Sequence, residues 1–362
     1  MERKFSGKIR RIVVKVGSSV IANERMKPRL DLLKSLTAQI ALLRAFGCEV
    51  ILVSSGAIVF GMGDMGLKKR PADLASLQAL AAVGQTVLMK KYKELFKIKK
   101  LNCAQILLTW DDFDDRTRFN NARNTFETML KWGIVPIINE NDTIATDEIR
   151  FGDNDKLSAL VSSLIGADLL VNLSDVDGFY DTRKQNKVVI NEIKDITKDI
   201  EDLASGTTKS DISRGGMKAK LNAVKIATHA KIPCVIASAH AENVLLRIVK
   251  GENIGTLFAA KEEKLLGRKH WISFGAKPKG IIFIDDGAKK AVLQGGRSLL
   301  LPGIISSEGN FKKGDVVVVA DKDKNEIARG IIDYSSEDLN KGDDKRGKPE
   351  AVHRNNLVLT NS

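Results

Sequence analysis

The feature of the sequence that most constrains the fold is an alternation of short apolar runs with stretches of helical periodicity. Runs rich in β-branched residues recur at 12–16, 49–53, 104–108, 134–138, 169–173 and 234–237. Strands that alternate with helices pair in parallel, with the helices covering the sheet. The sequence therefore predicts an α/β domain with an open, mostly parallel sheet and helices on both faces.

After residue 258 the pattern changes from alternation to short strands alone. A charged segment, 261–269, leads through Trp271 to Pro278, and strand-like runs separated by turn residues follow at 280–284, 303–305, 315–320, 326–332 and 351–359. Such a pattern is typical of a small, mostly β domain. We predict an α/β domain over 1–260, a linker over 261–278 and a small, mostly β domain over 279–362.

The chain is strongly basic, with 58 Lys plus Arg against 45 Asp plus Glu and a net charge of +13. A nucleic acid or an anionic small molecule could be the partner of such a chain. Residues 279–362 carry 14 basic against 13 acidic residues, so the excess lies before them. A near-neutral β domain argues against strong RNA binding by that domain. Six lysines between Lys90 and Lys100 are interpreted as the solvated face of a helix predicted over 72–101.

The positions of the cysteines and the lack of a targeting segment exclude further classes of protein. Cys48, Cys103 and Cys234 are far apart and each flanks an apolar run, which argues against a disulfide framework or a metal site. Neither an apolar leader segment nor an 18-residue apolar stretch is visible, so we expect a cytoplasmic protein without a membrane anchor.

The first strand carries Lys15 within an apolar run and ends at Gly17. A buried lysine must be paired or face an anion; the alternative is that it extends to solvent from an edge strand. The second strand ends at Ser54-Ser55-Gly56, where an open α/β sheet binds carboxylates or phosphates. A serine that merely caps the next helix is the alternative. No P-loop motif is present.

Gly61, Gly63 and Gly66 match the pattern GxGxxG. The dinucleotide-binding form of this motif needs its first glycine at the end of a strand and an acidic residue about 20 positions later. Neither condition is met. We interpret the segment as a flexible loop.

Two polar clusters follow the fourth strand. They are 139–143, with the sequence NENDT, and 152–156, with the sequence GDNDK, which opens a helix predicted over 156–165. Carboxylates and amides can hold the ammonium group of an amino acid. One of Asp153, Asn154 and Asp155 can be explained as the helix cap; because one cap does not need three such residues, we expect at least one to be functional.

The segments 174–178 and 214–220 suit a nucleotide. The first follows the fifth strand, although turn chemistry alone could explain it. In the second, Gly215 and Gly216 begin a helix, where backbone N–H groups can approach a phosphate. Lys220 lies one turn further and its side chain points back toward that end. Two lysines with an aspartate near both are suited to phosphoryl transfer.

Taken together, VVKVGSSV, SSGAI, INENDTI, FGDNDKLSAL, SDVDG, RGGMKAK and AVHRNN resemble the glutamate 5-kinase branch of the amino-acid kinase family, which carries a small C-terminal, β-barrel-like PUA domain. The resemblance implies ATP-dependent phosphorylation of the side-chain carboxylate of L-glutamate, the first step of proline biosynthesis. It also implies Mg²⁺, feedback inhibition by proline, a homo-oligomer and hand-over of the product to glutamyl phosphate reductase.

The resemblance also implies roles for particular residues. Lys15 and Lys220 match the lysines that stabilise the transferring phosphoryl group, and Asp155 matches the aspartate that orients them. The implied glutamate-binding residues are Ser55, Gly56, Asn139, Asp142 and Asn154. The implied ATP-binding residues are Ser174, Asp175, Gly215, Gly216, Met217, Lys218 and Lys220. No protein ligand of Mg²⁺ is implied.

The chain departs from the family pattern in the nucleotide segment, where Ser213, Arg214 and Ala219 replace a Gly-Thr pair and a threonine. Two hydroxyl groups are lost and a cation is gained, so the contacts to ATP are the least transferable part of the resemblance. Related kinases of N-acetylglutamate, aspartate or UMP, and an RNA-binding protein acting through the PUA domain, are the alternatives.

Overall fold

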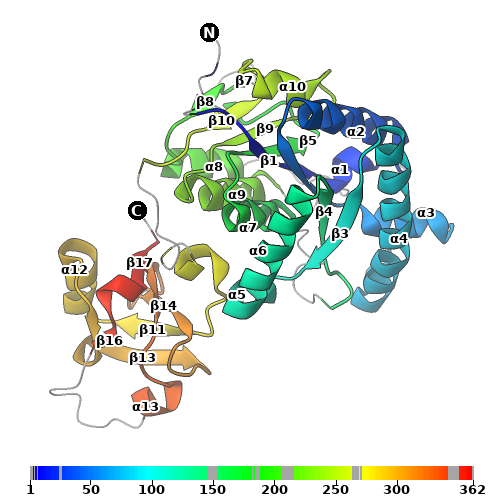
Figure 1. Cartoon of the computed structure of the whole chain (residues 1–362). Coiled ribbons are helices and arrows are strands. Elements are labelled where there is room, and N and C mark those ends of the chain that lie inside the picture. The colour runs from blue at the N-terminus through cyan, green and yellow to red at the C-terminus, as the bar shows by residue number, and fades with distance from the viewer. Residues whose placement is uncertain are drawn as a thin grey trace. The chain divides into compact units, whose positions relative to one another are not determined.

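A computed structural model describes the chain except for residues 1, 2, 4, 6, 24–26, 145–153, 182, 184–187, 206–215, 263–268, 270, 341–349, 361 and 362. The chain forms two compact units (Figure 1). The first comprises Met1–Asp112 and Arg116–Lys264, and the second comprises Phe113–Asp115 and Leu265–Ser362. Within the described ranges, no helix has both the length and the apolar character needed to cross a bilayer.

The first unit is built on an eight-stranded sheet with the order β3-β4-β2-β1-β5-β9-β10-β8. All neighbouring strands are parallel except β9 and β10. The predicted mostly parallel sheet is therefore confirmed. Its strands are β1 (Arg11–Val16), β2 (Glu49–Ser54), β3 (Cys103–Leu108), β4 (Val135–Glu140), β5 (Leu169–Ser174), β8 (Glu192–Ile193), β9 (Cys234–Ser238) and β10 (Thr256–Phe258).

Helices cover both faces of this sheet (Figure 1). One face carries α2 (Leu30–Ala45), α3 (Ala57–Asp64), α4 (Leu74–Ile98) and α10 (Val244–Val249). The other carries α6 (Arg116–Lys131), α7 (Asn154–Ile165), α8 (Lys198–Ser205) and α9 (Met217–His229). Short elements complete the chain to residue 260: α1 (Ser18–Ile21), α5 (Asp111–Asp114), and the paired strands β6 (Tyr180–Asp181) and β7 (Val188–Val189).

The alternation of β1 separates an apolar face from a polar one. Ile12, Val14 and Val16 belong to the core formed with α2, α4 and α10. Arg11 and Lys15 point to the opposite face, because successive side chains of a strand alternate. That face is covered by α7.

The glycine-rich segment that we interpreted as a flexible loop begins inside a helix, so that interpretation was wrong for Gly61 and Gly63, while Gly66 lies in the turn that follows. Gly61 and Gly63 lie inside α3. A Cβ atom on Gly61 would lie 2.0 Å from the carbonyl oxygen of Leu80, and one on Gly84 would lie 1.8 Å from that of Ala57. Gly61 and Gly84 are needed because α3 and α4 pack backbone against backbone there.

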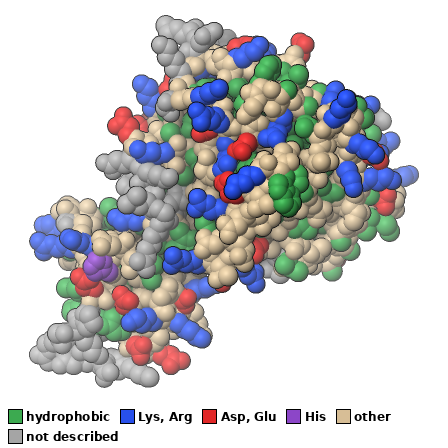
Figure 2. All heavy atoms as spheres, viewed as in Figure 1, with side chains coloured by type: hydrophobic (Ala, Val, Ile, Leu, Met, Phe, Trp, Pro, Cys, Tyr) green, Lys and Arg blue, Asp and Glu red, His purple; other side chains and the backbone are tan. Residues whose placement is uncertain are grey.

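Helix α4 begins at an Asp73 cap, whose carboxylate accepts from the Ser76 backbone N–H at 2.8 Å, and ends close to its predicted boundary. Lys90, Lys93 and Lys97 are exposed, as expected of a solvated face. In the view of Figure 2, Lys and Arg are spread over the surface among Asp and Glu and do not gather in one patch.

The second unit contains a five-stranded sheet with the order β13-β11-β14-β15-β17 and a separate pair, β12-β16. Only β11 and β14 are parallel. The strands are β11 (Gly280–Ile284), β12 (Leu299–Leu300), β13 (Ile304–Gly309), β14 (Val316–Ala320), β15 (Glu326–Ile331), β16 (Glu350–Val352) and β17 (Leu357–Leu359).

Two sequence expectations for this unit were wrong. The strand expected over 351–359 is two strands, β16 and β17, separated by a short helical turn at Arg354–Asn356. Two helices, α12 (Asp286–Gly295) and α13 (Ser336–Asn340), were not predicted. The local signal for α12 was Asp285, whose carboxylate accepts from the Ala288 backbone N–H at 2.7 Å and caps the helix.

Candidate active site

The candidate site lies where the neighbouring strands β4, β2, β1 and β5 reach their carboxyl ends. Backbone hydrogen bonds tie the segments that leave these strands to one another. The N–H of Ser55 donates to the Val16 carbonyl at 3.1 Å, and the N–H of Gly17 donates to the Leu173 carbonyl at 3.4 Å. Ligands of open α/β sheets bind at this edge.

A buried charged triad, Lys15, Asp155 and Lys220, occupies the polar face of β1. The Lys15 ammonium donates to Oδ1 of Asp155, and the Lys220 ammonium donates to Oδ2 at 3.1 Å. The three residues are 3%, 1% and 8% exposed. The alternative that Lys15 extends to solvent from an edge strand is wrong, because β1 lies between β2 and β5.

The charges of the triad determine the ionisation of Asp155. Burial by itself would raise the pKa of this carboxyl group, but the charges of Lys15 and Lys220 and hydrogen bonds from Lys15 and Asn172 outweigh burial and hold the pKa well below its ordinary value. Asp155 is therefore ionised at neutral pH. One carboxylate fixes the positions of two ammonium groups that arise far apart in the sequence.

Sequence reasoning missed Asn172, which completes the surroundings of Asp155. It lies on β5 opposite Lys15 of β1, and its Nδ2 donates to Oδ1 of Asp155 at 2.7 Å. Its own Oδ1 is buried without a hydrogen-bond partner among the described residues. The available signal was a polar residue within the apolar run LLVNLS.

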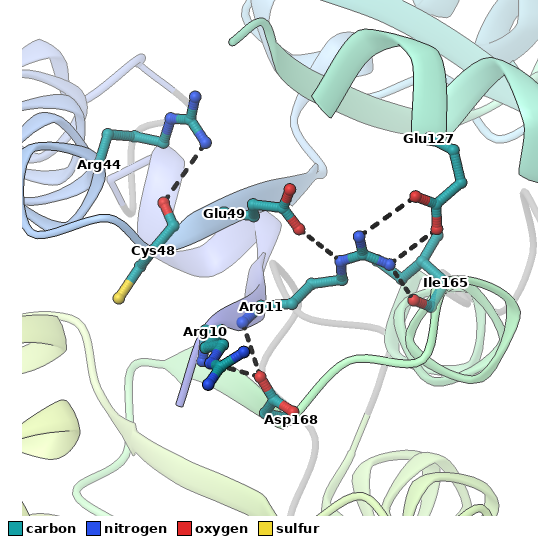
Figure 3. Close-up of polar contacts among 8 residues, drawn as sticks. All are labelled: Arg10, Arg11, Arg44, Cys48, Glu49, Glu127, Ile165 and Asp168. Atoms are coloured by element: carbon teal, nitrogen blue, oxygen red, sulfur yellow. Dashed lines mark hydrogen bonds and ion pairs between the residues drawn. The ribbon is translucent and has the colours of Figure 1, made fainter. Parts of the chain in front are cut away.

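At the amino-terminal end of β1, Arg11 forms a second network (Figure 3). Its guanidinium donates to Glu49 of β2 at 2.7 Å, to Glu127 of α6 at 2.8 Å and to the carbonyl of Ile165, the last residue of α7, at 2.5 Å. Contacts at both ends thus hold α7 against β1, through Arg11 at one end and Lys15 at the other.

A chain of hydrogen-bonded side chains lies beside the triad and joins four elements. Nδ2 of Asn154, on α7, donates to Oγ of Ser55, after β2, and to Oδ1 of Asn139, on β4, both at 2.8 Å. Nδ2 of Asn139 then donates to Oε1 of Gln85, on α4, at 2.9 Å. Gln85 was not predicted; the available signal was a polar residue on the apolar stripe of α4. We call Ser55, Asn154, Asn139 and Gln85 the amide relay.

The remaining expected glutamate-binding residues, Gly56 and Asp142, lie at the ends of β2 and β4. Gly56 has a φ of 106° and precedes α3 without a side-chain cap, so the interpretation of Ser55 as a helix cap was wrong. A Cβ atom on Gly56 would lie 3.1 Å from Ile21, and the positive φ favours glycine. Asp142 is half-buried in the turn after β4.

Of the expected nucleotide residues, Ser174 ends β5 and its hydroxyl donates to Asp175 at 2.9 Å. Gly216 is the N-cap residue of α9 and, being glycine, has no side chain to cap that end. Met217 is buried and Lys218 is exposed. The expectations for Asp153, Ser213, Arg214 and Gly215 lie outside the described residues.

The arrangement is suited to moving an anionic group. Two ammonium groups converge on one carboxylate, which also accepts from Nδ2 of Asn172. The start of α9, where Gly216 is the cap residue, offers backbone N–H donors one turn before Lys220. A mostly parallel α/β fold with two buried cations at the carboxyl edge of its sheet is typical of a phosphotransferase.

Comparisons with known proteins agree with this class. Residues 10–238 match the model of the amino acid kinase family, and residues 280–354 match the PUA domain. The glutamate 5-kinase of Geobacter sp. (strain M21) is 44% identical over 99% of this chain and 100% of its own length. That of Dictyoglomus thermophilum is 47% identical over 97% of this chain and 98% of its own length. The chain belongs to the glutamate 5-kinase family, and as a kinase it uses ATP.

Proposed function

We propose that this protein transfers the γ-phosphoryl group of ATP to the side-chain carboxylate of L-glutamate and forms L-glutamyl 5-phosphate. The relatives of nearly equal length carry the name of this activity. The observation that carries the proposal is the buried triad at the edge of the sheet, next to the amide relay. One cluster of side chains suits the phosphoryl group and the other suits a polar amino acid.

In the proposed mechanism, the carboxylate of glutamate is the nucleophile and attacks the γ-phosphorus directly. The bond from that phosphorus to the bridging oxygen of ATP breaks, and ADP leaves with the electron pair. No general base is needed because the nucleophile is ionised at neutral pH. Lys15 and Lys220 stabilise the charge on the transferring group, and Asp155 keeps both ammonium groups in place.

The substrates are assigned to opposite sides of the triad. Ser55, Gly56, Asn139, Asp142 and Asn154 hold glutamate. Ser174, Asp175 and the segment 215–220 hold ATP, with Ala219 offering no hydroxyl there.

Mg²⁺ is proposed to accompany ATP and to neutralise phosphate charge. Both carboxylate oxygens of Asp155 already accept hydrogen bonds. Because Asp155 is engaged in this way, the side chains of the triad would leave Mg²⁺ to be held by phosphate oxygens and water. Proline inhibition, a homo-oligomer and transfer of the product to glutamyl phosphate reductase belong to the same proposal.

The test is to supply L-glutamate, N-acetylglutamate, aspartate and UMP separately with MgATP. ADP release reports turnover, and hydroxylamine traps an acyl phosphate as its hydroxamate. We expect hydroxamate from L-glutamate. Hydroxamate from aspartate or N-acetylglutamate without any from L-glutamate would contradict the proposal.

A further inference from the structure

The direction of the hydrogen bonds in the amide relay is fixed by one backbone group. Oδ1 of Asn139 accepts from the backbone N–H of Glu140 at 3.0 Å. A backbone N–H can only donate, so the atom of Asn139 that faces it must be the oxygen. Its Nδ2 therefore faces Gln85, and Gln85 must present Oε1. For the same reason Asn154 presents Nδ2 to Asn139.

This order of donors and acceptors leaves Oδ1 of Asn154 as an acceptor at the end of the relay opposite Gln85. Because Nδ2 of Asn154 is occupied by Asn139 and Ser55, its Oδ1 faces away from both. Asn154 is 7% exposed, and its Oδ1 has no hydrogen-bond partner within the described part of the chain. A buried carbonyl oxygen without a partner is costly unless a ligand donor completes it. The ammonium group of an α-amino acid is such a donor.

Gln85 is the only member of the relay on α4, and it is 8% exposed. Without its Oε1, the Nδ2 of Asn139 would be buried with no acceptor. That penalty favours rotamers of Asn139 that turn away from Asn154. The Nε2 of Gln85 is itself buried with no partner among the residues described, which is a poor arrangement if Gln85 serves only stability.

We infer that Gln85 is a positioning residue of the glutamate subsite. It acts through Asn139 to aim Oδ1 of Asn154 at the ammonium group of the substrate. This inference rests on the proposed function and deepens it, because it names a residue that sets recognition of the free amino group. Among the described residues, Gln85 is hydrogen-bonded to Asn139 and not to the triad.

The test replaces the amide with an unbranched side chain of similar length, Gln85→Met. We expect KM for L-glutamate to rise about tenfold, the factor that corresponds to one lost hydrogen bond. KM for ATP should stay within about twofold, since the triad is intact. The midpoint of urea unfolding should barely move, because a lost hydrogen bond is offset by removal of the unpartnered Nε2.

Two further measurements distinguish a positioning role of Gln85 from a general disturbance of the glutamate subsite. Glutarate lacks the ammonium group, so its inhibition constant against glutamate should be the same in wild type and Gln85→Met. In an Asn139→Ala background, Gln85→Met should change KM for glutamate by less than about twofold, because the residue through which it acts is gone.

A matched control is Gln39→Met on α2. Gln39 is also buried, but its Oε1 accepts from the Leu245 backbone N–H at 2.9 Å and its Nε2 donates to Ser35 at 3.1 Å. This variant should lower the unfolding midpoint and leave KM for glutamate unchanged, the reverse of Gln85→Met.

The outcomes are distinguishable. An unchanged KM for glutamate in Gln85→Met, an equal rise in the glutarate constant, or an additive effect with Asn139→Ala would overturn the role of Gln85 while wild-type turnover of glutamate stands. A wild-type enzyme that does not phosphorylate glutamate would overturn the proposed function, and this inference with it.

Discussion

Replacement of Asp155 by asparagine tests the triad directly, because it removes one charge and almost no volume. In the folded protein Asp155 accepts from Lys15, Lys220 and Asn172. Asp155→Asn leaves two ammonium groups, on residues 3% and 8% exposed, without their counter-charge. Removal of one partner from a buried ion pair destabilises a protein by about 3–5 kcal/mol. That is a large part of a typical stability of about 5–15 kcal/mol.

The same substitution should reduce kcat by about 10²–10³, the usual effect of losing one preorganised electrostatic group. Initial rates of hydroxamate formation give kcat, and urea unfolding gives the free energy of unfolding. KM for glutamate should change less than kcat, since the amide relay remains. Wild-type kcat in a folded Asp155→Asn protein would refute the role of the triad, and an unchanged unfolding free energy would refute the electrostatic argument.

The pH dependence of stability provides a second check on Asp155. Its folded-state pKa is lowered, while the unfolded value is about 3.9. The stabilisation is therefore fully present above about pH 4 and is lost as the pH falls toward the folded pKa. The difference in unfolding free energy between wild type and Asp155→Asn should be constant near neutrality and should shrink below about pH 4. A difference that grew on acidification would contradict the sign of the shift.

Three other substitutions test individual contacts. Asn172→Leu should lower kcat about tenfold by releasing Asp155. The unfolding free energy should stay within about 1 kcal/mol of the wild-type value, because the lost hydrogen bond to Asp155 is offset by removal of an unpartnered buried oxygen. A kcat equal to that of the wild type would contradict this. Gly84→Ala places a Cβ 1.8 Å from the Ala57 carbonyl and should cost about 1–3 kcal/mol or more in urea unfolding; wild-type stability would show that α3 and α4 can separate freely. Arg11→Met should lower unfolding stability by about 1–3 kcal/mol with little change in kcat; a matching loss of kcat would mean that the attachment of α7 at its far end also sets the triad.

The mostly parallel sheet could be predicted because burial on both faces demands continuous apolar runs. The boundaries of β1, β2 and β5 were close to prediction for that reason. The interpretation of the segment around Gly61 as a loop was wrong because a glycine in a loop and a glycine at a contact between helices look alike in sequence. The packing of Gly61 against Leu80 is a contact between two different helices, which no local pattern encodes.

At the site, the identity of the chemistry-bearing residues could be predicted but their partners could not. Lys15 had to be paired or face an anion because an isolated ammonium group is too costly to bury. That its partner is Asp155, and that Lys220 shares it, follows from the packing of α7 on β1 and of α9 against α7. Gln85 and Asn172 carry no motif, so only their neighbours in space reveal them.

The sequence by itself determined the periodicity of burial, the polar residues at strand ends and the family motifs, because these depend on residues close together in the chain. The tertiary structure alone decided which side chains meet. Asn172 meets Asp155, and Gln85 meets Asn139, across 17 and 54 residues of sequence. Hydrogen bonds form between atoms about 3 Å apart, and the packing of the sheet and its helices brings those atoms together.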